Sequence, residues 1–135
     1  MSHRGACQCG QLTITADADP EIVLVCTCVQ CQRRSGSAFT HAAFFLRDRV
    51  TVTGRARTWI RPAPGGRTLT NHFCPDCGTT LFWAPEIRPD YYGVAAGCLE
   101  TRIADPSMLI WASEKPDWLA FPAGWAQHAG SPQRR

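Results

Sequence analysis

The chain has 135 residues, of which 44% are hydrophobic, and its formal net charge is +3. This length suits a single domain, so we expect one domain over residues 1–129 and a frayed polar tail over residues 130–135. The mild charge forms no concentrated basic stripe, which argues against a nucleic-acid partner. No run approaches the roughly 18 apolar residues of a membrane-spanning helix. The start lacks the apolar stretch of a signal peptide, so we expect no membrane partner and a cytoplasmic location.

Short strands separated by turns are the elements that the sequence favours, because 10 prolines and 11 glycines interrupt long helices. Alternating apolar and polar residues indicate half-buried strands. In chain order, strands are expected at residues 11–16, 22–25, 40–46, 50–53, 56–61, 68–73, 79–83, 91–96 and 108–112. Turns are expected at residues 17–20, 47–49 and 62–66, and at residues 33–37 after a short helical turn. The expected fold class is therefore mainly β, with Trp118, Phe121 and Trp125 packed against the body of the domain.

The spacing of the eight cysteines is the strongest signal in the chain. Seven of them fall into clusters in which one or two residues separate neighbouring cysteines, so that several sulfurs can point at one soft metal ion. Eight cysteines could instead pair as disulfides. However, a cysteine cannot easily bridge to so close a neighbour, and thiols stay reduced in the cytoplasm. We therefore favour metal binding.

Two of these clusters predict a closed four-sulfur site. Cys74 and Cys77, followed by Gly78, have the spacing of a zinc knuckle, and Cys7 with Cys9 supplies a second pair. A compact zinc ribbon keeps its pairs about 15–20 residues apart, which is far closer than these pairs lie. The metal would therefore fasten the N-terminal segment to a distant hairpin. Such sites contribute on the order of 10 kcal/mol to folding. Zinc is favoured over iron because no redox partner motif is present.

The third cluster, Cys26, Cys28 and Cys31, offers three thiolates within six residues. Three sulfurs leave a tetrahedral zinc with one open position, as catalytic zinc requires. Such a site carries a net charge of about −1, so it suits the binding of a fourth thiol better than hydrolysis. A protein ligand could instead close the site, and three side chains are candidates: Cys98, His41 and His72.

Basic residues follow this triplet directly. Arg33 and Arg34 could offset its negative charge and hold the carboxylates of an anionic thiol. Backbone N–H groups at a turn through Ser35 and Gly36 could receive a carboxylate as well. The alternative interpretation is that both arginines are solvated surface charges.

Four segments together resemble the glutathione-dependent formaldehyde-activating enzyme family, which shares its domain with centromere protein V. These segments are residues 5–10, 26–39, 73–78 and 97–100, and the similarity extends in order over about residues 3–120. The sequence departs from the family pattern at Cys98, at Glu100 and at Leu109 with Ile110. These departures bear on the substrate more than on the fold.

The resemblance implies a β-tent, in which several antiparallel sheets are organised around zinc. It implies two Zn²⁺ ions per chain: a structural one on Cys7, Cys9, Cys74 and Cys77, and a catalytic one on Cys26, Cys28 and Cys31. The activity that it implies is addition of glutathione to formaldehyde to give S-hydroxymethylglutathione, a carbon–sulfur lyase reaction. The competing hypothesis is a non-catalytic binding module stabilised by zinc.

Overall fold

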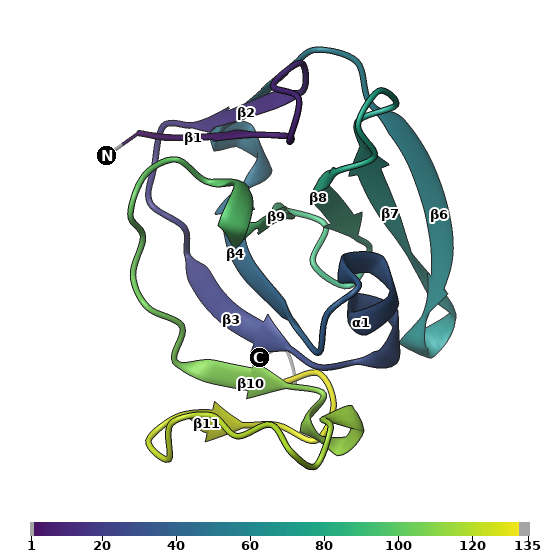
Figure 1. The fold of residues 1–135 in the computed structure, drawn as a ribbon, viewed down its shortest axis with the longest axis vertical. Coiled ribbons are helices and arrows are strands. Elements are labelled where there is room, and N and C mark those ends of the chain that lie inside the picture. The colour runs from purple at the N-terminus through teal and green to yellow at the C-terminus, as the bar shows by residue number, and fades with distance from the viewer. Residues whose placement is uncertain (1, 133–135) are drawn as a thin grey trace. The chain divides into compact units, whose positions relative to one another are not determined.

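The computed structural model of the chain describes residues 2–132. Strands hold 42% of the residues and helices 15%, so the predicted mainly β class is confirmed. The described chain divides into two compact units, residues 2–22 with 43–103 and residues 23–42 with 104–132 (Figure 1). The single domain expected over residues 1–129 stays a prediction. Residues 133–135 of the expected tail lie outside the described residues.

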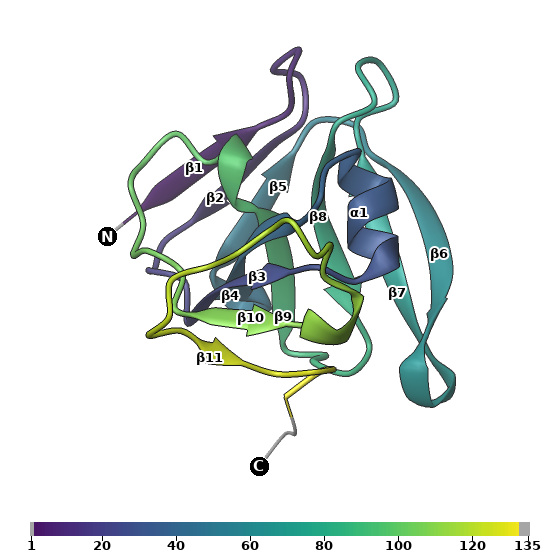
Figure 2. The ribbon, with the colours of Figure 1, turned by 60° about the horizontal axis from the view of Figure 1, so that its bottom comes forward.

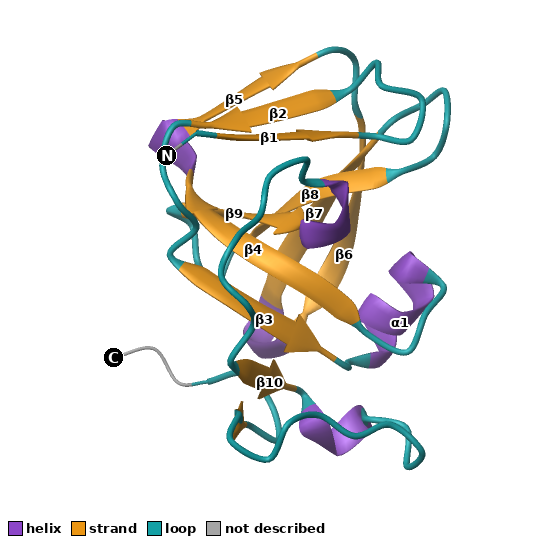
Figure 3. Cartoon of the chain, turned by 60° about the vertical axis from the view of Figure 1, so that its left-hand side comes forward, coloured by secondary structure: helices purple, strands orange, loops and turns teal. Residues whose placement is uncertain are grey.

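The first unit contains a three-stranded antiparallel sheet in the order β1-β2-β5 (Figure 3). Its strands are β1 (His3–Ala6), β2 (Thr13–Ala16) and β5 (Val50–Thr53). In β2, Ile14 and Ala16 are buried whereas Thr15 is exposed, which is the period of two that a half-buried strand requires. Ile14 lies opposite Gly5 on one side and Val52 on the other.

Four further strands of the first unit pair antiparallel in the order β9-β8-β7-β6, and β4, whose residues from Ala43 on belong to this unit, lies beside β9. Their bounds are β4 (Thr40–Leu46), β6 (Arg57–Ala63), β7 (Arg67–Phe73), β8 (Thr80–Pro85) and β9 (Tyr91–Ala95). The hairpin between β6 and β7 closes at the expected proline- and glycine-rich loop. Gly65 and Gly66 adopt positive φ angles of 79° and 73° there, which residues with side chains resist.

β6 is the last strand of its sheet, and a proline interrupts its backbone pattern. Pro62 lies opposite Thr68 of β7. The Thr68 N–H donates to Glu86 Oε1 at 2.5 Å, and the Thr68 carbonyl accepts from the Glu86 N–H at 3.0 Å. Both backbone groups of Thr68 are therefore directed away from β6. Pro62, which has no N–H, thus lies at a position where β6 donates no hydrogen bond to β7.

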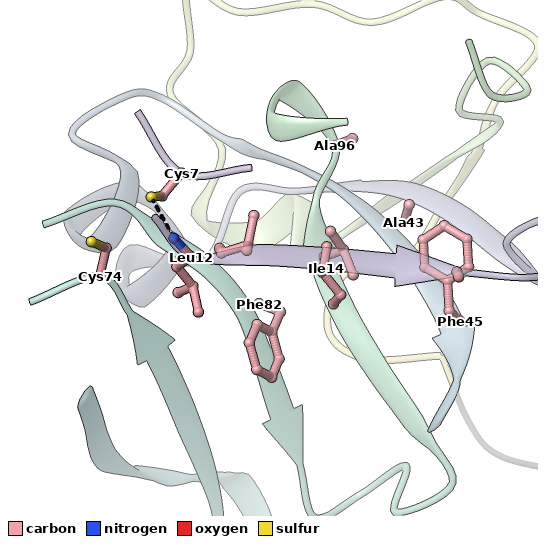
Figure 4. Close-up of a cluster of buried hydrophobic side chains, with 11 residues drawn as sticks. Cys7, Leu12, Ile14, Ala43, Phe45, Cys74, Phe82 and Ala96 are labelled. Carbon is pink, nitrogen blue, oxygen red and sulfur yellow. Dashed lines mark hydrogen bonds between the residues drawn. The ribbon is translucent and has the colours of Figure 1, made fainter. Parts of the chain in front are cut away.

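The core of the first unit is an apolar cluster to which both groups of strands contribute (Figure 4). Leu12, Phe45 and Leu81 are at most 1% exposed. Burial of one side chain of this size contributes about 1.5–3 kcal/mol to folding. Cys7 and Cys74 lie at one end of the cluster, so the predicted four-sulfur site borders the apolar core.

The second unit contains a short parallel sheet and one α-helix (Figure 2). Its elements are β3 (Ile22–Cys26), α1 (Val29–Ser35), β10 (Met108–Ile110) and β11 (Ala126–Gln127). β10 pairs parallel with β3, placing Ile110 opposite Cys26, and parallel with β11. The sequence indicates neither this parallel pairing nor β1 and β11.

Helix α1 occupies part of the segment that the sequence predicts as a turn. The Cys28 sulfur accepts a hydrogen bond from the Cys31 N–H at its start, and Gly36 ends it with φ of 66°. The helix has only seven residues, which is too short for a helical period of apolar residues to be visible in the sequence. Among the helices of residues 2–132, none has the length and apolar character needed to cross a membrane.

The expected packing of Trp118 is wrong, because its side chain is 76% exposed. It lies in a turn closed by the Leu119 N–H donating to the Pro116 carbonyl, and this turn directs the indole outward. Phe121 and Trp125 are half-buried and stack on each other with ring centroids 5.2 Å apart.

Replacing Gly54 by alanine should destabilise the protein. Gly54 has a φ of +100°, and a Cβ there would lie 2.1 Å from the Gln11 carbonyl oxygen, so the backbone would have to shift. We expect a loss of about 2 kcal/mol or more in the free energy of unfolding, measured by urea denaturation.

Gly97→Ala is the matched control. A Cβ at Gly97 meets nothing within 4 Å. Its effect should stay within about 0.5 kcal/mol. Equal losses in the two variants would contradict this account of Gly54.

Candidate metal centres

Two similar turns present the four cysteines of the first unit. Cys7 follows β1 and Cys74 follows β7, and in each turn a glycine N–H donates back to the first cysteine's carbonyl. These glycines are Gly10, with φ of 85°, and Gly78, with φ of 80°. The left-handed conformation folds each turn back, so that both cysteines of a pair face the same point.

The geometry of this cluster fits a tetrahedral metal ion. All four sulfurs lie within 4.8 Å of one another. The Sγ atoms of Cys7 and Cys9 are 3.7 Å apart, as are those of Cys9 and Cys74. A tetrahedron of sulfurs with zinc–sulfur bonds of about 2.3 Å has edges of about 3.8 Å. The cluster could therefore hold a metal ion.

Hydrogen bonds favour the thiolate forms of two of these cysteines, Cys74 and Cys77. Burial acts against the charged form of Cys74, but hydrogen bonds from Gln11 and from backbone N–H groups, that of Asp76 at 3.4 Å among them, lower its pKa. Bonds from the hydroxyl and the backbone of Thr79 lower the pKa of Cys77 to about 5. Thiolates are the form of cysteine that ligates metal.

Gln11 is a residue of this centre that the sequence does not reveal. Its side-chain amide nitrogen lies 2.9 Å from Cys74 Sγ and 2.7 Å from the Arg55 carbonyl. Its amide oxygen accepts from the Arg55 N–H at 3.0 Å. One side chain thus joins the segment before β2, the loop before β6 and a sulfur. No local pattern signals such a long-range role.

The second cluster gathers Cys26, Cys28 and Cys31, whose sulfurs also lie within 4.8 Å of one another. β3 ends at Cys26, Cys28 caps α1, and Cys31 lies in the first turn of that helix. The sulfurs of Cys26 and Cys28, followed by Arg34 and Thr40, lower the pKa of Cys31. The same coupling raises the pKa of Cys26. The triplet could hold a metal ion, and one thiolate is favoured even before the metal binds.

The three candidates for a fourth ligand occupy other surroundings. His41 lies outside the group of three, and its buried Nε2 has no hydrogen-bond partner among residues 2–132. Burial lowers the pKa of His41, so the ring is neutral at physiological pH. His72 belongs to the first unit and stacks on Phe82 with centroids 4.3 Å apart.

Cys98 also belongs to the first unit, where it is half-buried. Burial raises the pKa of Cys98, and the charges of Cys7 and Cys77 raise it further. It is not gathered into either group of metal-ligand side chains in the described chain. These conditions keep Cys98 as a thiol beside the four-sulfur centre.

The residues expected to bind substrate all lie at the end of α1. Arg33 is exposed, whereas Arg34 Nη2 donates to Thr40 Oγ1 at 2.7 Å. The Ser35 hydroxyl donates to the Cys31 carbonyl at 2.8 Å. The Gly36 N–H donates to the Gln32 carbonyl at 2.8 Å, so it is engaged within the helix cap. Their role as a carboxylate site stays a prediction.

Glu114 and Gln32 fix the start of α1, and the sequence singles out neither. Gln32 Nε2 donates to the carbonyls of Thr27, at 2.8 Å, and Glu114, at 3.2 Å. Glu114 Oε1 accepts from the Val29 N–H at 3.4 Å. These contacts join the triplet segment to the region after β10, far along the chain.

A mainly β chain that gathers four cysteine sulfurs at one point and three at another is a protein with two candidate centres for soft metal ions. A family model described as glutathione-dependent formaldehyde-activating enzyme matches residues 2–114. The chain belongs to this family, as its motifs indicate.

A solved structure supports the fold. The crystal structure of a Rhodobacter sphaeroides protein, a structural genomics target, matches with a TM-score of 0.57 and 23% sequence identity. The match covers 73% of this chain and 89% of that chain. At this identity the likeness bears on the fold alone.

Cysteine substitutions should separate the two centres. Cys74→Ser removes a sulfur that joins distant segments, so we expect loss of metal-linked folding energy on the order of 10 kcal/mol and little soluble protein. Cys28→Ser removes a sulfur from a local cluster and should leave a folded protein with one metal ion fewer. Soluble yield, thermal melting and elemental analysis measure these outcomes. Equal loss of thermal stability in both variants would refute the division.

Proposed function

We propose that the chain is a zinc-dependent carbon–sulfur lyase that joins a thiol, glutathione, to a small aldehyde, formaldehyde, to give S-hydroxymethylglutathione. The observation that carries this proposal is the triplet, in which three sulfurs gather without a fourth ligand-type side chain in the described part of the chain. Membership of the family supports the choice of reaction. A cytoplasmic location, where thiols stay reduced, suits such a site.

The proposal assigns one Zn²⁺ ion to each centre. The ion on Cys7, Cys9, Cys74 and Cys77 would be structural, because four sulfurs complete a tetrahedron. At Cys26, Cys28 and Cys31, zinc would supply an open position that favours the thiolate form of a substrate thiol. The chemistry needs no redox partner, because addition of a thiol to an aldehyde transfers no electrons to or from the protein.

The residues around the triplet would orient the substrate. In the reaction, the thiol sulfur forms a bond to the carbonyl carbon, and the thiol proton ends on the carbonyl oxygen. Arg34 lies close enough to lower the pKa of Cys31, so its charge acts at the cluster. Arg33 is exposed on the same helical turn and would meet a substrate carboxylate. Ser35 and Gly36 would shape the turn that brings the chain back to Thr40.

Metal content gives a first test of this proposal. The freshly purified protein should contain about two zinc ions per chain, measured by elemental analysis after zinc supplementation. Cys31→Ser should reduce this content to about one. One zinc or fewer in the unmodified protein, together with disulfides seen by mass spectrometry, would count against both centres.

Thiol binding gives a direct test of the open position. In the cobalt-substituted protein, millimolar glutathione should change the visible spectrum, because a new thiolate ligand alters the metal's absorption. Binding should strengthen as pH rises toward the thiol pKa, because ligation releases a proton. Arg33→Gln should weaken binding, whereas Arg88→Gln, on a loop of the other unit, should not. An unchanged spectrum would favour the binding-module hypothesis.

A further inference from the structure

Strand register in the first unit aligns four residues across one face of its larger sheet. Trp59 of β6 lies opposite Asn71 of β7, Asn71 lies opposite Trp83 of β8, and Trp83 lies opposite Gly93 of β9. Directly opposed residues in antiparallel strands project to the same side. The row therefore presents an amide between two indoles, followed by a position without a side chain.

The two indoles of this row behave differently. A Cβ on Gly93 would lie 2.2 Å from Trp83 Nε1 and 2.9 Å from its Cδ1, so the Trp83 indole covers Gly93. Trp83 thus inclines toward β9, away from β7, and is 4% exposed. Trp59 stands at the sheet edge and is 58% exposed. Of the two side chains flanking Asn71, Trp59 is therefore the one that faces solvent.

Asn71 is the anomalous residue of the row. It is 6% exposed, and its Oδ1 is buried without a hydrogen-bond partner among the described residues. Nearly all buried carbonyl oxygens in folded proteins accept a hydrogen bond, because an unmade one is costly. An unpartnered amide oxygen beside an exposed indole is suited to accept an N–H from a bound molecule.

Two positive charges flank this position. Arg57 and Arg61 lie two residues before and after Trp59 on β6, so they project to the same face. Within residues 2–132 neither forms an ion pair, and Arg61 Nη1 donates a hydrogen bond to the neighbouring Pro62 carbonyl at 3.1 Å. By contrast, Arg55 is paired with Asp76 at 2.6 Å. Uncompensated guanidinium groups on a strand bind carboxylates in a bidentate manner.

We infer that Trp59, Asn71 and Arg61 form a binding site for a small peptide-like carboxylate. In this site Asn71 Oδ1 accepts a peptide N–H of the ligand, and Arg61 and Arg57 hold its carboxylate. The indole packs against the ligand's aliphatic part. This combination of N–H donor, carboxylate and short aliphatic chain distinguishes the ligand class from simple inorganic anions. The choice of a glutathione derivative as the test ligand rests on the proposed function.

S-methylglutathione tests the site without involving the triplet, because its blocked sulfur has no proton to lose. Calorimetry with the full, zinc-loaded chain should show binding, accompanied by a change in tryptophan fluorescence. Asn71→Leu and Arg61→Gln should each weaken binding about tenfold or more. Trp59→Ala should weaken it and abolish most of the fluorescence change.

Ile60→Ala is the matched control. Ile60 is 60% exposed on the same strand but projects to the opposite face, so its loss should leave the affinity within about twofold. If Asn71→Leu does not fold, as judged by thermal melting, the comparison of Trp59→Ala with Ile60→Ala decides the question.

Three results would overturn the inference. They are no binding of S-methylglutathione up to about 10 mM, equal effects of Trp59→Ala and Ile60→Ala, and displacement of the probe by inorganic phosphate at matching concentration. The last would mean that the arginines attract any anion. Failure of glutathione to change the cobalt spectrum is a separate result, because it concerns the triplet alone.

Discussion

The convergence of four sulfurs on one point is the constraint on which the first unit depends. Cys7 and Cys74 come from segments that are far apart in the chain, yet the sulfur spacing of 3.7 Å within the cluster leaves little freedom in placing them. Gly10 and Gly78 make the two turns possible, and Gln11 ties a sulfur to the loop before β6. The apolar core begins directly beside these sulfurs, so the packing of the core and the placing of the sulfurs must be satisfied together.

The triplet is placed by local structure instead, because its three sulfurs come from the end of β3 and the first turn of α1. A local cluster tolerates loss of one ligand without separating distant segments. Its surroundings also depend on a long-range contact, because Glu114 accepts hydrogen bonds from Val29 and Gln32 at the start of the helix. Thr40, closer in the chain, accepts from Arg34. A local set of sulfurs at a helix start, supported by Glu114 from far along the chain, would suit the proposed site, which exchanges its fourth ligand.

The sequence predicts the features that are set by residues close together in the chain. Alternation is enough to identify β5, and spacing is enough to identify the two cysteine groups. β1 escapes prediction because its residues, His3–Ala6, show no apolar alternation and are held by pairing with β2. α1 is predicted only in part: a short helical turn is expected before residue 33, but the helix continues through Ser35, and it is too short for a helical period to show its bounds. Gln11 and Asn71 give no signal, because their surroundings come from strands distant in sequence.

The proline near the end of β6 has a consequence for the protein's behaviour in concentrated solution. An open strand edge is a template on which other chains can add strands. Since Thr68 turns its backbone groups toward Glu86, Pro62 faces outward from the sheet, and backbone direction alternates along the strand. Outward N–H groups therefore remain only at Thr58 and Ile60 on this side of the proline. A second chain that pairs with this edge can accept hydrogen bonds from these two N–H groups but from none at Pro62. An intermolecular β-sheet therefore cannot extend past the proline.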